Sequence, residues 1–455
     1  MTGPRQTDRL RRLDKRHLWH PFTPMAEWVA GDPVIIERGQ GEFLFDTDGR
    51  RYLDGVSSLW CNVHGHRRAE LDEAVRRQLD RIAHSTLLGL GSPPSIELAA
   101  RLAALAPAGL ARVFYSDSGS AAVEVALKMA FQYWHECADP QPQRSKFVHL
   151  QYAYHGDTLG AASVGGIDLF HRLYRPLLFE ALEAPAPYCY RCPLGLGPGS
   201  CGLACAARME ELLKARGEEV AAVIVEPLVQ GAAGMIVHPA GYLRRVADAC
   251  RAAGTLLIAD EVATGFGRTG RLFACEHEGV RPDLMCVGKG LSGGYLPLAA
   301  TLATDRLYEA FLGDPAAGRT FYHGHTYTGN ALACAAALAS LEVFEKDRVL
   351  DRIGGLAERL ASLLGPVAAL GHVGQVRRRG LMVGLELVAD RATRSPFPAA
   401  ERRGGAACRA ARRHGVWVRP LGDVVVLMPP YCISEEGLAA LVDGVRRGIE
   451  EATAG

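Results

Sequence analysis

The chain has 455 residues, 48% of them hydrophobic and 22% charged, with a formal net charge of +1 at pH 7. This near-neutral charge argues against nucleic acid as a partner, and no apolar run approaches the roughly 20 residues of a membrane span, so we expect no membrane association. The length predicts two domains, and the 12 cysteines of so large a chain indicate reduced thiols in a cytoplasmic protein.

The first 65 residues begin with an arginine-rich segment and continue as short strands. Residues 1–17 lack the apolar core of a secretory signal, so we interpret them as a solvated helix. Residues 42–46 have a strand pattern and stand just before Asp48-Gly49, a dipeptide typical of hairpin turns. We expect this part of the chain to pack with the C-terminal domain.

A candidate phosphate site follows the short β run at 112–115. Ser116–Ser120 is a loop of small and polar residues, and a helix is predicted over 124–134. Small residues let backbone amides approach a phosphate, and the start of a helix offers unpaired N–H donors. The alternative is an ordinary helix cap, because Asp and Ser are preferred at that position.

A second loop, Tyr154-His155-Gly156-Asp157, follows the strand predicted at 147–152. The aromatic ring of Tyr154 is a candidate to stack on a planar cofactor. The alternative is a surface turn, which Gly156 and Asp157 would also suit.

Four cysteines lie close together in a segment rich in Pro and Gly. Their spacing is C-x2-C-x8-C-x3-C, and we call residues 189–205 the cysteine loop. Four thiolates can hold zinc or an iron–sulfur cluster, with zinc the stronger candidate. The alternatives are free surface thiols or adventitious disulfides. The candidate metal ligands are Cys189, Cys192, Cys201 and Cys205.

The middle of the chain alternates strands and helices. Apolar runs at 221–225, 256–259 and 284–287 predict buried strands, and 242–253 is an amphipathic helix. This alternation predicts an α/β fold with a mostly parallel sheet covered on both faces by helices. Ligands of such sheets bind at the carboxyl ends of the strands.

Two polar residues stand at those strand ends. Asp260 follows the run at 256–259, and Lys289 follows the run at 284–287 between two glycines. A lysine amine that forms a Schiff base, together with an acid that keeps a pyridine nitrogen protonated, is what pyridoxal phosphate chemistry requires. The chain has six lysines among its 51 basic residues, so few side chains compete for this role.

Residues 265–270 match the dinucleotide fingerprint G-x-G-x-x-G. We reject that interpretation because no helix start follows Gly270 and the preceding strand lies mid-chain. A nicotinamide enzyme would also leave Lys289 unexplained.

The last third predicts a smaller α+β domain, with a helix over 349–364 and strands at 380–386 and 424–428. We therefore predict an N-terminal segment over 1–65, a large cofactor-binding domain over 66–344 and a C-terminal domain over 345–455.

The motifs resemble the class III pyridoxal phosphate aminotransferases of fold type I. The resemblance spans nearly the whole chain and is most specific in residues 260–270 and in Gly288-Lys289-Gly290. Within that class the chain is similar to the members that serve biotin biosynthesis. The markers are residues 17–23, 57–60, 133–134, 154–158 and 416–420.

The resemblance implies a role for each matched residue. Lys289 is implied to bind the cofactor covalently, Asp260 to contact its pyridine nitrogen and Tyr154 to cover its ring. An obligatory homodimer is implied, in which His325 and Thr326 reach the phosphate bound by the neighbouring subunit. The implied cofactor-binding residues are Gly119, Ser120, Tyr154, Asp260, Val262, Lys289, His325 and Thr326, and the implied substrate-binding residues are Phe22, Leu59, Trp60, Tyr154, Gly324 and Arg419.

The implied reaction is transfer of an amino group to 8-amino-7-oxononanoate, which gives 7,8-diaminononanoate. Members that use S-adenosylmethionine as donor carry a tyrosine and a tryptophan where this chain has Phe22 and Leu59. Lysine is therefore the expected donor, with S-adenosylmethionine as the alternative. Another ω-aminotransferase, acting on a diamine or an ω-amino acid, is the alternative function.

Overall fold

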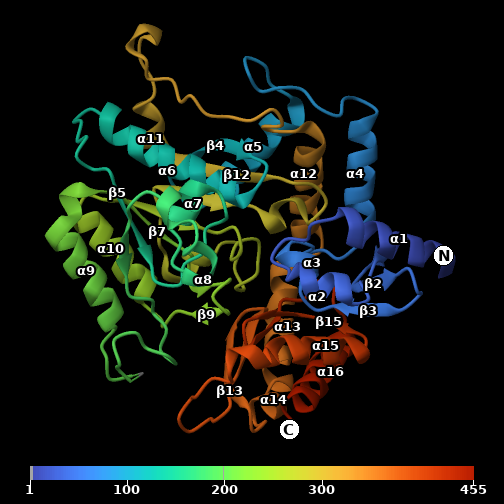
Figure 1. Cartoon of the computed structure of the whole chain (residues 1–455). Helices are drawn as coiled ribbons and strands as arrows, with labels where there is room; N and C mark the ends of the chain where they lie inside the picture. Colours follow the sequence, from blue (N-terminus) through green and yellow to red (C-terminus); the bar gives the residue numbers. More distant parts are fainter. Residues whose placement is uncertain (1–3, 198, 455) are drawn as a thin grey trace.

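The computed structural model describes residues 4–197 and 199–454 (Figure 1). Its largest sheet has seven strands, namely β4 (Leu110–Ser116), β5 (Lys146–Leu150), β6 (Leu182–Ala184), β7 (Val220–Val225), β10 (Leu256–Asp260), β11 (Leu284–Val287) and β12 (Ala299–Thr304). Their order across the sheet is β4-β12-β11-β10-β7-β5-β6.

The large sheet is mostly parallel. Strand β10 runs parallel to β7 and β11, and β5 runs parallel to β6 and β7. Strand β12 is antiparallel to its neighbours β11 and β4. Every residue of β7, β10 and β11 is buried, as expected where helices cover both faces. The predicted α/β fold is confirmed.

Helices and one short hairpin surround this sheet. Helix α6 packs against β11 and β12, α5 against β4 and α10 against β10. The elements are α4 (Ala69–Leu79), α5 (Pro93–Leu105), α6 (Gly119–Glu136), α7 (Leu159–Ser163), α8 (Asp168–His171), β8 (Val229–Gln230), β9 (Ile236–Val237), α9 (Ala204–Arg216), α10 (Tyr242–Ala252), α11 (Asp305–Glu309) and α12 (Ala331–Lys346).

Helix α6 begins five residues before its predicted start. The reason is a side-chain cap, because Oγ of Ser118 accepts a hydrogen bond from the backbone N–H of Ala121 at 3.2 Å. The cap satisfies a donor that would otherwise lack a partner at the helix start. Gly119 and Ser120 therefore form the first turn of a long helix.

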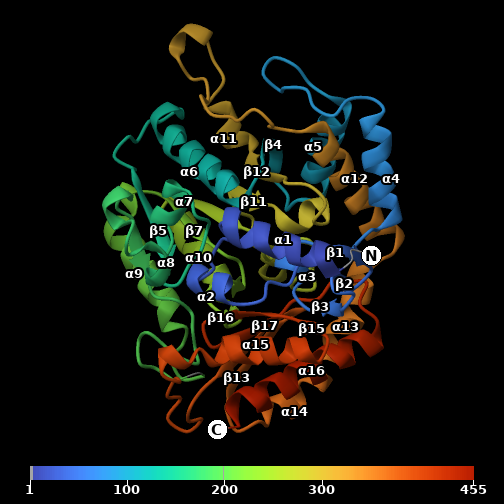
Figure 2. The same ribbon diagram turned by 45° about the vertical axis from the view of Figure 1, so that its right-hand side comes forward.

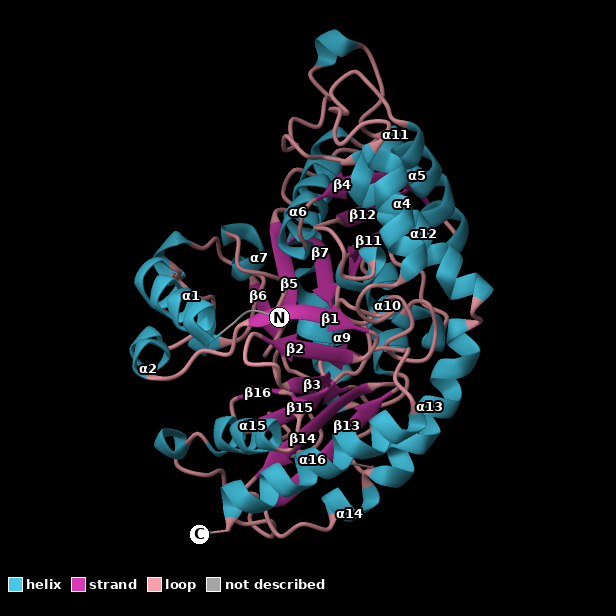
Figure 3. Ribbon diagram, turned by 90° about the vertical axis from the view of Figure 1, so that its right-hand side faces the viewer, coloured by secondary structure: helices cyan, strands magenta, loops and turns pink. Residues whose placement is uncertain are grey.

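The C-terminal part is built on a four-stranded sheet. Its order is β13-β14-β17-β16, and each neighbouring pair is antiparallel. Figure 3 shows α12 and α13 following one another along one side of the molecule, from the large sheet to this smaller one. The elements are α13 (Val349–Leu363), α14 (Gly365–Ala368), β13 (Val373–Arg379), β14 (Met382–Leu387), α15 (Arg403–Arg413), β16 (Arg419–Leu421), β17 (Val424–Leu427) and α16 (Glu435–Thr453).

The N-terminal segment joins a third sheet together with one C-terminal strand. Strand β3 pairs in parallel with β15, which places Leu53 opposite Val416. In Figure 2, α1 lies between the large sheet and the C-terminal helices. The elements are α1 (Pro4–His17), α2 (Met25–Ala30), β1 (Ile36–Gln40), β2 (Phe43–Asp46), β3 (Arg51–Asp54), α3 (Ser57–Trp60) and β15 (Val416–Trp417).

The predicted hairpin before residue 55 is present as β2 and β3, which pair antiparallel. The domain boundaries at 65/66 and 344/345 stay a prediction, and α12 continues to Lys346. Among the helices of the described residues, none is both long and apolar enough to cross a membrane.

Candidate active site

A buried acid ends the central strand β10. Asp260 is 5% exposed, and its Oδ2 lies 2.7 Å from Nδ1 of His155, which is also buried. The other carboxylate oxygen accepts a hydrogen bond from the backbone N–H of Val262 at 3.1 Å. These contacts fix the carboxylate at the carboxyl edge of the sheet, where ligands of α/β proteins bind.

Lys289 follows the neighbouring strand β11 and opens a short 3₁₀ turn. Its backbone has φ 42°, in the left-handed region that costs energy for a residue with a Cβ. Its Nζ lies 5.4 Å from the centre of the Trp60 ring. Burial lowers the pKa of Lys289, and the nearby carboxyls of Asp260 and Glu226 partly oppose that shift. A lysine held in this way is more readily neutral and nucleophilic.

Two glycines, Gly119 in α6 and Gly156 in the loop 154–157, pack closely at the start of α6. A Cβ at Gly119 would lie 2.6 Å from Cγ1 of Val262, and one at Gly156 would lie 2.0 Å from Oγ of Ser120. Gly156 also has φ +126°, which L side chains rarely adopt. The first N–H groups of a helix have no partner within it, so this turn can bind an anion.

Aromatic rings connect residues that are far apart in the sequence. The ring of Phe170 lies 6.0 Å from that of Tyr154 and 5.3 Å from that of Phe22, both edge to face. The hydroxyl of Tyr154 donates to Oδ2 of Asp157 at 2.9 Å. Burial lowers the pKa of Arg419 and the nearby Tyr154 opposes the shift, so the guanidinium lies in the neighbourhood of Tyr154.

The backbone of Trp60 is fixed by Arg268, an arginine within the G-x-G-x-x-G pattern at residues 265–270. Arg268 is 1% exposed and donates to the backbone carbonyls of Trp60 at 3.2 Å and Pro429 at 2.7 Å. A Cβ at Gly231 would lie 3.2 Å from the Trp60 ring, so the ring is enclosed on that side. Its neighbour Leu59 is 47% exposed.

Comparisons with known proteins agree with this geometry. The model of the family described as aminotransferase class-III matches residues 25–449. The adenosylmethionine-8-amino-7-oxononanoate aminotransferase of Nitratidesulfovibrio vulgaris is 60% identical over 98% of this chain and 82% of its own length. The chain belongs to the class III aminotransferases.

Solved structures give the same result for the fold of this class III aminotransferase. The crystal structure of adenosylmethionine-8-amino-7-oxononanoate aminotransferase from Methanocaldococcus jannaschii is 46% identical, with a TM-score of 0.93 over 98% of this chain and 99% of that one. An (S)-enantioselective omega-transaminase from Thermomicrobium roseum is 37% identical, with a TM-score of 0.93 over 99% of each chain.

A class III aminotransferase depends on pyridoxal phosphate, and the residues of this chain fit that cofactor. Asp260 offers a buried carboxylate for a pyridinium nitrogen, and Lys289 offers an amine with a lowered pKa. Gly119 leaves no room for a side chain at the helix start that a phosphate would need. The individual roles of these residues stay predictions.

The segment that carries Gly324, His325 and Thr326 lies in a different cavity. That cavity has a volume of about 1210 Å³, and its described lining contains neither Lys289 nor Asp260 of the same chain. His84 Nε2 lies 2.8 Å from the backbone oxygen of Thr326. The role predicted for this segment, toward a neighbouring subunit, stays a prediction.

The fingerprint residues 265–270 form turns, and no helix opens among the described residues that follow Gly270 before the 3₁₀ turn at Ala274. Its buried arginine supports Trp60 instead. The dinucleotide interpretation was therefore rightly set aside.

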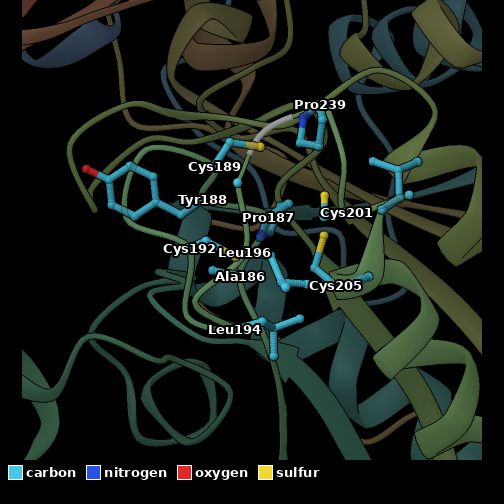
Figure 4. A pocket seen from close by; sticks show the side chains of 15 residues that line it. Ala186, Pro187, Tyr188, Cys189, Cys192, Leu194, Leu196, Cys201, Cys205 and Pro239 are labelled. Carbon is cyan, nitrogen blue, oxygen red and sulfur yellow. The ribbon is translucent and has the colours of Figure 1, made fainter.

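The cysteine loop surrounds one cavity of about 260 Å³ (Figure 4). All four of its thiols are free, and burial raises the pKa of Cys205 to about 11. Among the described residues, no three His, Cys, Asp or Glu side chains are arranged so that they could hold a metal ion. The metal predicted at Cys189, Cys192, Cys201 and Cys205 therefore stays a hypothesis.

Sequence reasoning missed two buried groups of the site. Glu226 directly follows the apolar strand β7, accepts backbone N–H groups from Tyr154 at 3.1 Å and Gly231 at 2.8 Å, and has a pKa that burial raises to about 7. The sequence indicated His155 only as a member of the loop 154–157 and did not predict its contact with Asp260. The signal for Glu226 was the one that identified Asp260, an acid directly after a buried strand.

Proposed function

We propose that this chain transfers an amino group to 8-amino-7-oxononanoate and forms 7,8-diaminononanoate, a step of biotin biosynthesis. The observation that carries the proposal is the placement of Arg419. Its guanidinium is partly buried beside Tyr154, and partial loss of water strengthens a pair between arginine and a carboxylate. The acceptor has one carboxylate at the end of an aliphatic chain.

The remaining surroundings suit that aliphatic chain. Phe22, Phe170 and Trp60 contribute aromatic surface near Tyr154 and Lys289. Relatives that are named for this acceptor support the proposal, among them the Nitratidesulfovibrio vulgaris enzyme at 60% identity and the Geobacter sulfurreducens enzyme at 53% identity.

The residues divide the chemistry between them. Pyridoxal phosphate, when bound, supplies an aldehyde and a ring that accepts electrons. Lys289 would hold the cofactor through its amine, and its Nζ would be the base that moves the substrate proton. Asp260, oriented by His155, would keep a positive charge on the ring nitrogen of the bound cofactor.

The amino donor is the finer part of the proposal. Phe22 and Leu59 favour lysine, because neither offers the hydroxyl or indole expected in users of S-adenosylmethionine. The comparisons do not support lysine, since the relatives carry adenosylmethionine in their names. Phe22 is 55% exposed and Leu59 is 47% exposed, so both side chains are available to a substrate.

The test is a half-reaction on the purified holoenzyme. Lysine and S-adenosylmethionine are added separately, and loss of the visible absorbance of the lysine-bound cofactor is followed for each. Conversion by lysine supports the donor hypothesis, whereas conversion by S-adenosylmethionine alone refutes it. The aminated enzyme is then mixed with 8-amino-7-oxononanoate, and recovery of the absorbance is expected. Recovery with an amino aldehyde or an ω-oxo acid but not with this acceptor would favour another ω-aminotransferase.

We propose further that the active form is a homodimer with shared sites. The cavity that holds Gly324, His325 and Thr326 is bordered by apolar side chains exposed on the single chain, including Leu88 at 83% and Tyr322 at 78%. Exposed apolar surface of this kind marks a protein interface. A second copy of this chain would cover it and receive Thr326 near its phosphate loop.

A mixing experiment tests the shared site. Lys289→Ala and Thr326→Asp are each expected to be inactive, because one removes the amine and the other places a negative charge near the phosphate. Co-refolding equal amounts restores one intact site per mixed dimer and about a quarter of the wild-type activity. No recovery, although mixed dimers are present, would refute the sharing of sites.

A further inference from the structure

The turn that carries Leu59 and Trp60 has a backbone conformation that is rare for residues with a side chain. The φ angles are positive at Ser57 (48°), Ser58 (60°) and Trp60 (67°). Ser58 also has ψ −78°, close to the strained classic γ-turn. Residues with a Cβ stay in such conformations only where the surrounding contacts fix them. The shape of this turn therefore depends on its anchors.

One anchor is the carboxylate of Asp54, the last residue of β3. Asp54 is fully buried, and its two oxygens accept the backbone N–H of Ser58 at 2.8 and 2.7 Å. Its Oδ2 also accepts the hydroxyl of Ser58 at 3.2 Å. Hydrogen bonds from backbone N–H groups to an ionised carboxylate are among the strong ones in proteins. Asp54 therefore offsets the strain in the middle of the turn.

His66 in turn fixes Asp54. Its Nε2 lies 2.8 Å from Oδ2 of Asp54, and its Nδ1 lies 3.1 Å from Nδ2 of Asn62. A carboxylate can only accept, so Nε2 carries the hydrogen and Nδ1 accepts from the amide. A Cβ at Gly39 would lie 2.6 Å from Cγ of His66, so the imidazole also packs closely against β1. Two hydrogen bonds and this packing hold the ring in one orientation.

The ends of the turn are anchored by other parts of the chain. The hydroxyl of Ser57 donates to the carbonyl of Met428 at 2.8 Å, and Arg268 donates to the carbonyl of Trp60 at 3.2 Å. Asp54 acts between these two ends. A change at Ser58 would therefore alter the part of the turn that leads directly into Leu59 and Trp60.

The turn places an aromatic ring beside the lysine of the candidate active site. Nζ of Lys289 lies 5.4 Å from the centre of the Trp60 ring. A side chain beside a reacting amine helps to orient the substrate, and misplacement by about 1 Å can lower a rate about 100-fold. The groups that fix the turn can therefore influence the reaction without touching the substrate.

From these contacts we propose that Asp54 and His66 are positioning residues for the amino substrate. They fix the turn Ser57–Trp60 and, through it, the Trp60 ring beside Lys289. The inference rests on the substrate-binding role proposed for Trp60. A loosened turn should harm a long aliphatic amine more than a short one, because only the long amine gains binding energy from a wall away from the reacting centre.

The test compares two amines in the half-reaction of the holoenzyme, namely 7,8-diaminononanoate and isopropylamine. His66→Ala should lower the second-order rate constant for 7,8-diaminononanoate about 10- to 100-fold and that for isopropylamine less than about threefold. His66→Gln, whose amide can donate to Asp54, should recover most of the loss. Equal losses with both amines, or equal defects in the two His66 variants, would overturn the proposal.

Tyr52→Phe is the matched control for a general loss of stability. The buried hydroxyl of Tyr52 donates to Oδ2 of Asp46 at 2.7 Å within the same sheet as Asp54. The substitution removes one buried hydrogen bond and leaves the anchors of the turn in place. Both rate constants should therefore stay at their wild-type values.

A second measurement needs no substrate and no variant that could fail to fold. Hydrogen–deuterium exchange at the amide of Ser58, read by mass spectrometry of the wild-type holoenzyme, should be slow because both oxygens of Asp54 accept that N–H. Exchange should be at least about tenfold faster in Asp54→Asn and unchanged in Tyr52→Phe. Fast exchange in the wild type would refute the anchor. Failure of the wild type to react with 7,8-diaminononanoate would instead count against the proposed function, since the exchange at Ser58 is independent of it.

Discussion

Glu226 accepts a hydrogen bond from the backbone N–H of Tyr154, with 3.1 Å between the nitrogen and Oε1. Its other oxygen accepts the N–H of Gly231 at 2.8 Å. One buried carboxyl thus joins the loop that carries Tyr154 to the turn that encloses Trp60. Because Glu226 is fully buried, its own ionisation must be linked to stability.

The sign of that linkage follows from the pKa. Burial raises the pKa of Glu226 from 4.5 to about 7, so the folded state prefers the protonated form. The contribution of Glu226 to stability is therefore fully present below pH 4.5 and is lost as pH rises to about 7. Relative to Glu226→Gln, the free energy of unfolding of the wild type should fall by about 3 kcal/mol across this window. Urea unfolding of both proteins at several pH values measures the difference, and a constant difference would contradict the prediction.

His155 is expected to act as a positioning residue for Asp260. Removal of its hydrogen bond in His155→Ala should lower kcat/KM about 10- to 100-fold, because the acceptor is a buried charged group. His155→Asn keeps a donor near the position of Nδ1 and should recover much of this loss. The pH profile of kcat/KM should shift in the alanine variant only. Equal defects in both variants would indicate a packing role instead.

Lys289 is expected to be indispensable. Lys289→Ala should lower turnover by at least about 10³-fold and remove the visible absorbance of lysine-bound cofactor. Lys214→Ala changes an exposed lysine on α9 and provides the matched control, with wild-type turnover and spectrum. A visible band that survives in Lys289→Ala would mean that another lysine binds the cofactor.

Arg419 is expected to determine affinity for the acceptor. Arg419→Lys keeps the charge but loses the planar pair of donors, so KM for 8-amino-7-oxononanoate should rise about 10- to 100-fold. Arg208→Lys, at an exposed position on α9, should leave KM unchanged. Steady-state kinetics at varied acceptor concentration measures KM. An unchanged KM in Arg419→Lys would mean that Arg419 does not bind the acceptor carboxylate.

Local sequence patterns were sufficient for much of the fold. Buried apolar runs predicted β7, β10 and β11, and the polar residues after two of them predicted Asp260 and Lys289 at one edge of the sheet. The start of α6 was placed too late, because apolar periodicity begins only after the capped first turn.

Contacts between distant segments could not be predicted in the same way. Phe22 meets Phe170, and His84 meets Thr326, only because the tertiary fold brings them together. Arg268 belongs to the G-x-G-x-x-G pattern at 265–270, which gives no sign of its role. Its hydrogen bonds to the carbonyls of Trp60 and Pro429 form only because the N- and C-terminal segments lie side by side.

Gly119 gives the sharpest test of the phosphate site. A Cβ there would lie 2.6 Å from Cγ1 of Val262, so Gly119→Ala must displace the first turn of α6 or Val262 itself. We expect the affinity for pyridoxal phosphate to fall at least about tenfold, because the backbone donors of that turn move with it.

The control for this change is Gly355→Ala. Gly355 lies within α13, and nothing lies within 4 Å of a Cβ built there. Alanine in a helix is more stable than glycine by up to about 1 kcal/mol, so this variant should keep its cofactor and unfold at the same or a higher temperature. Fluorescence titration of both apoenzymes with pyridoxal phosphate separates the two effects. Equal cofactor affinity in Gly119→Ala and Gly355→Ala would show that the start of α6 does not bind the phosphate.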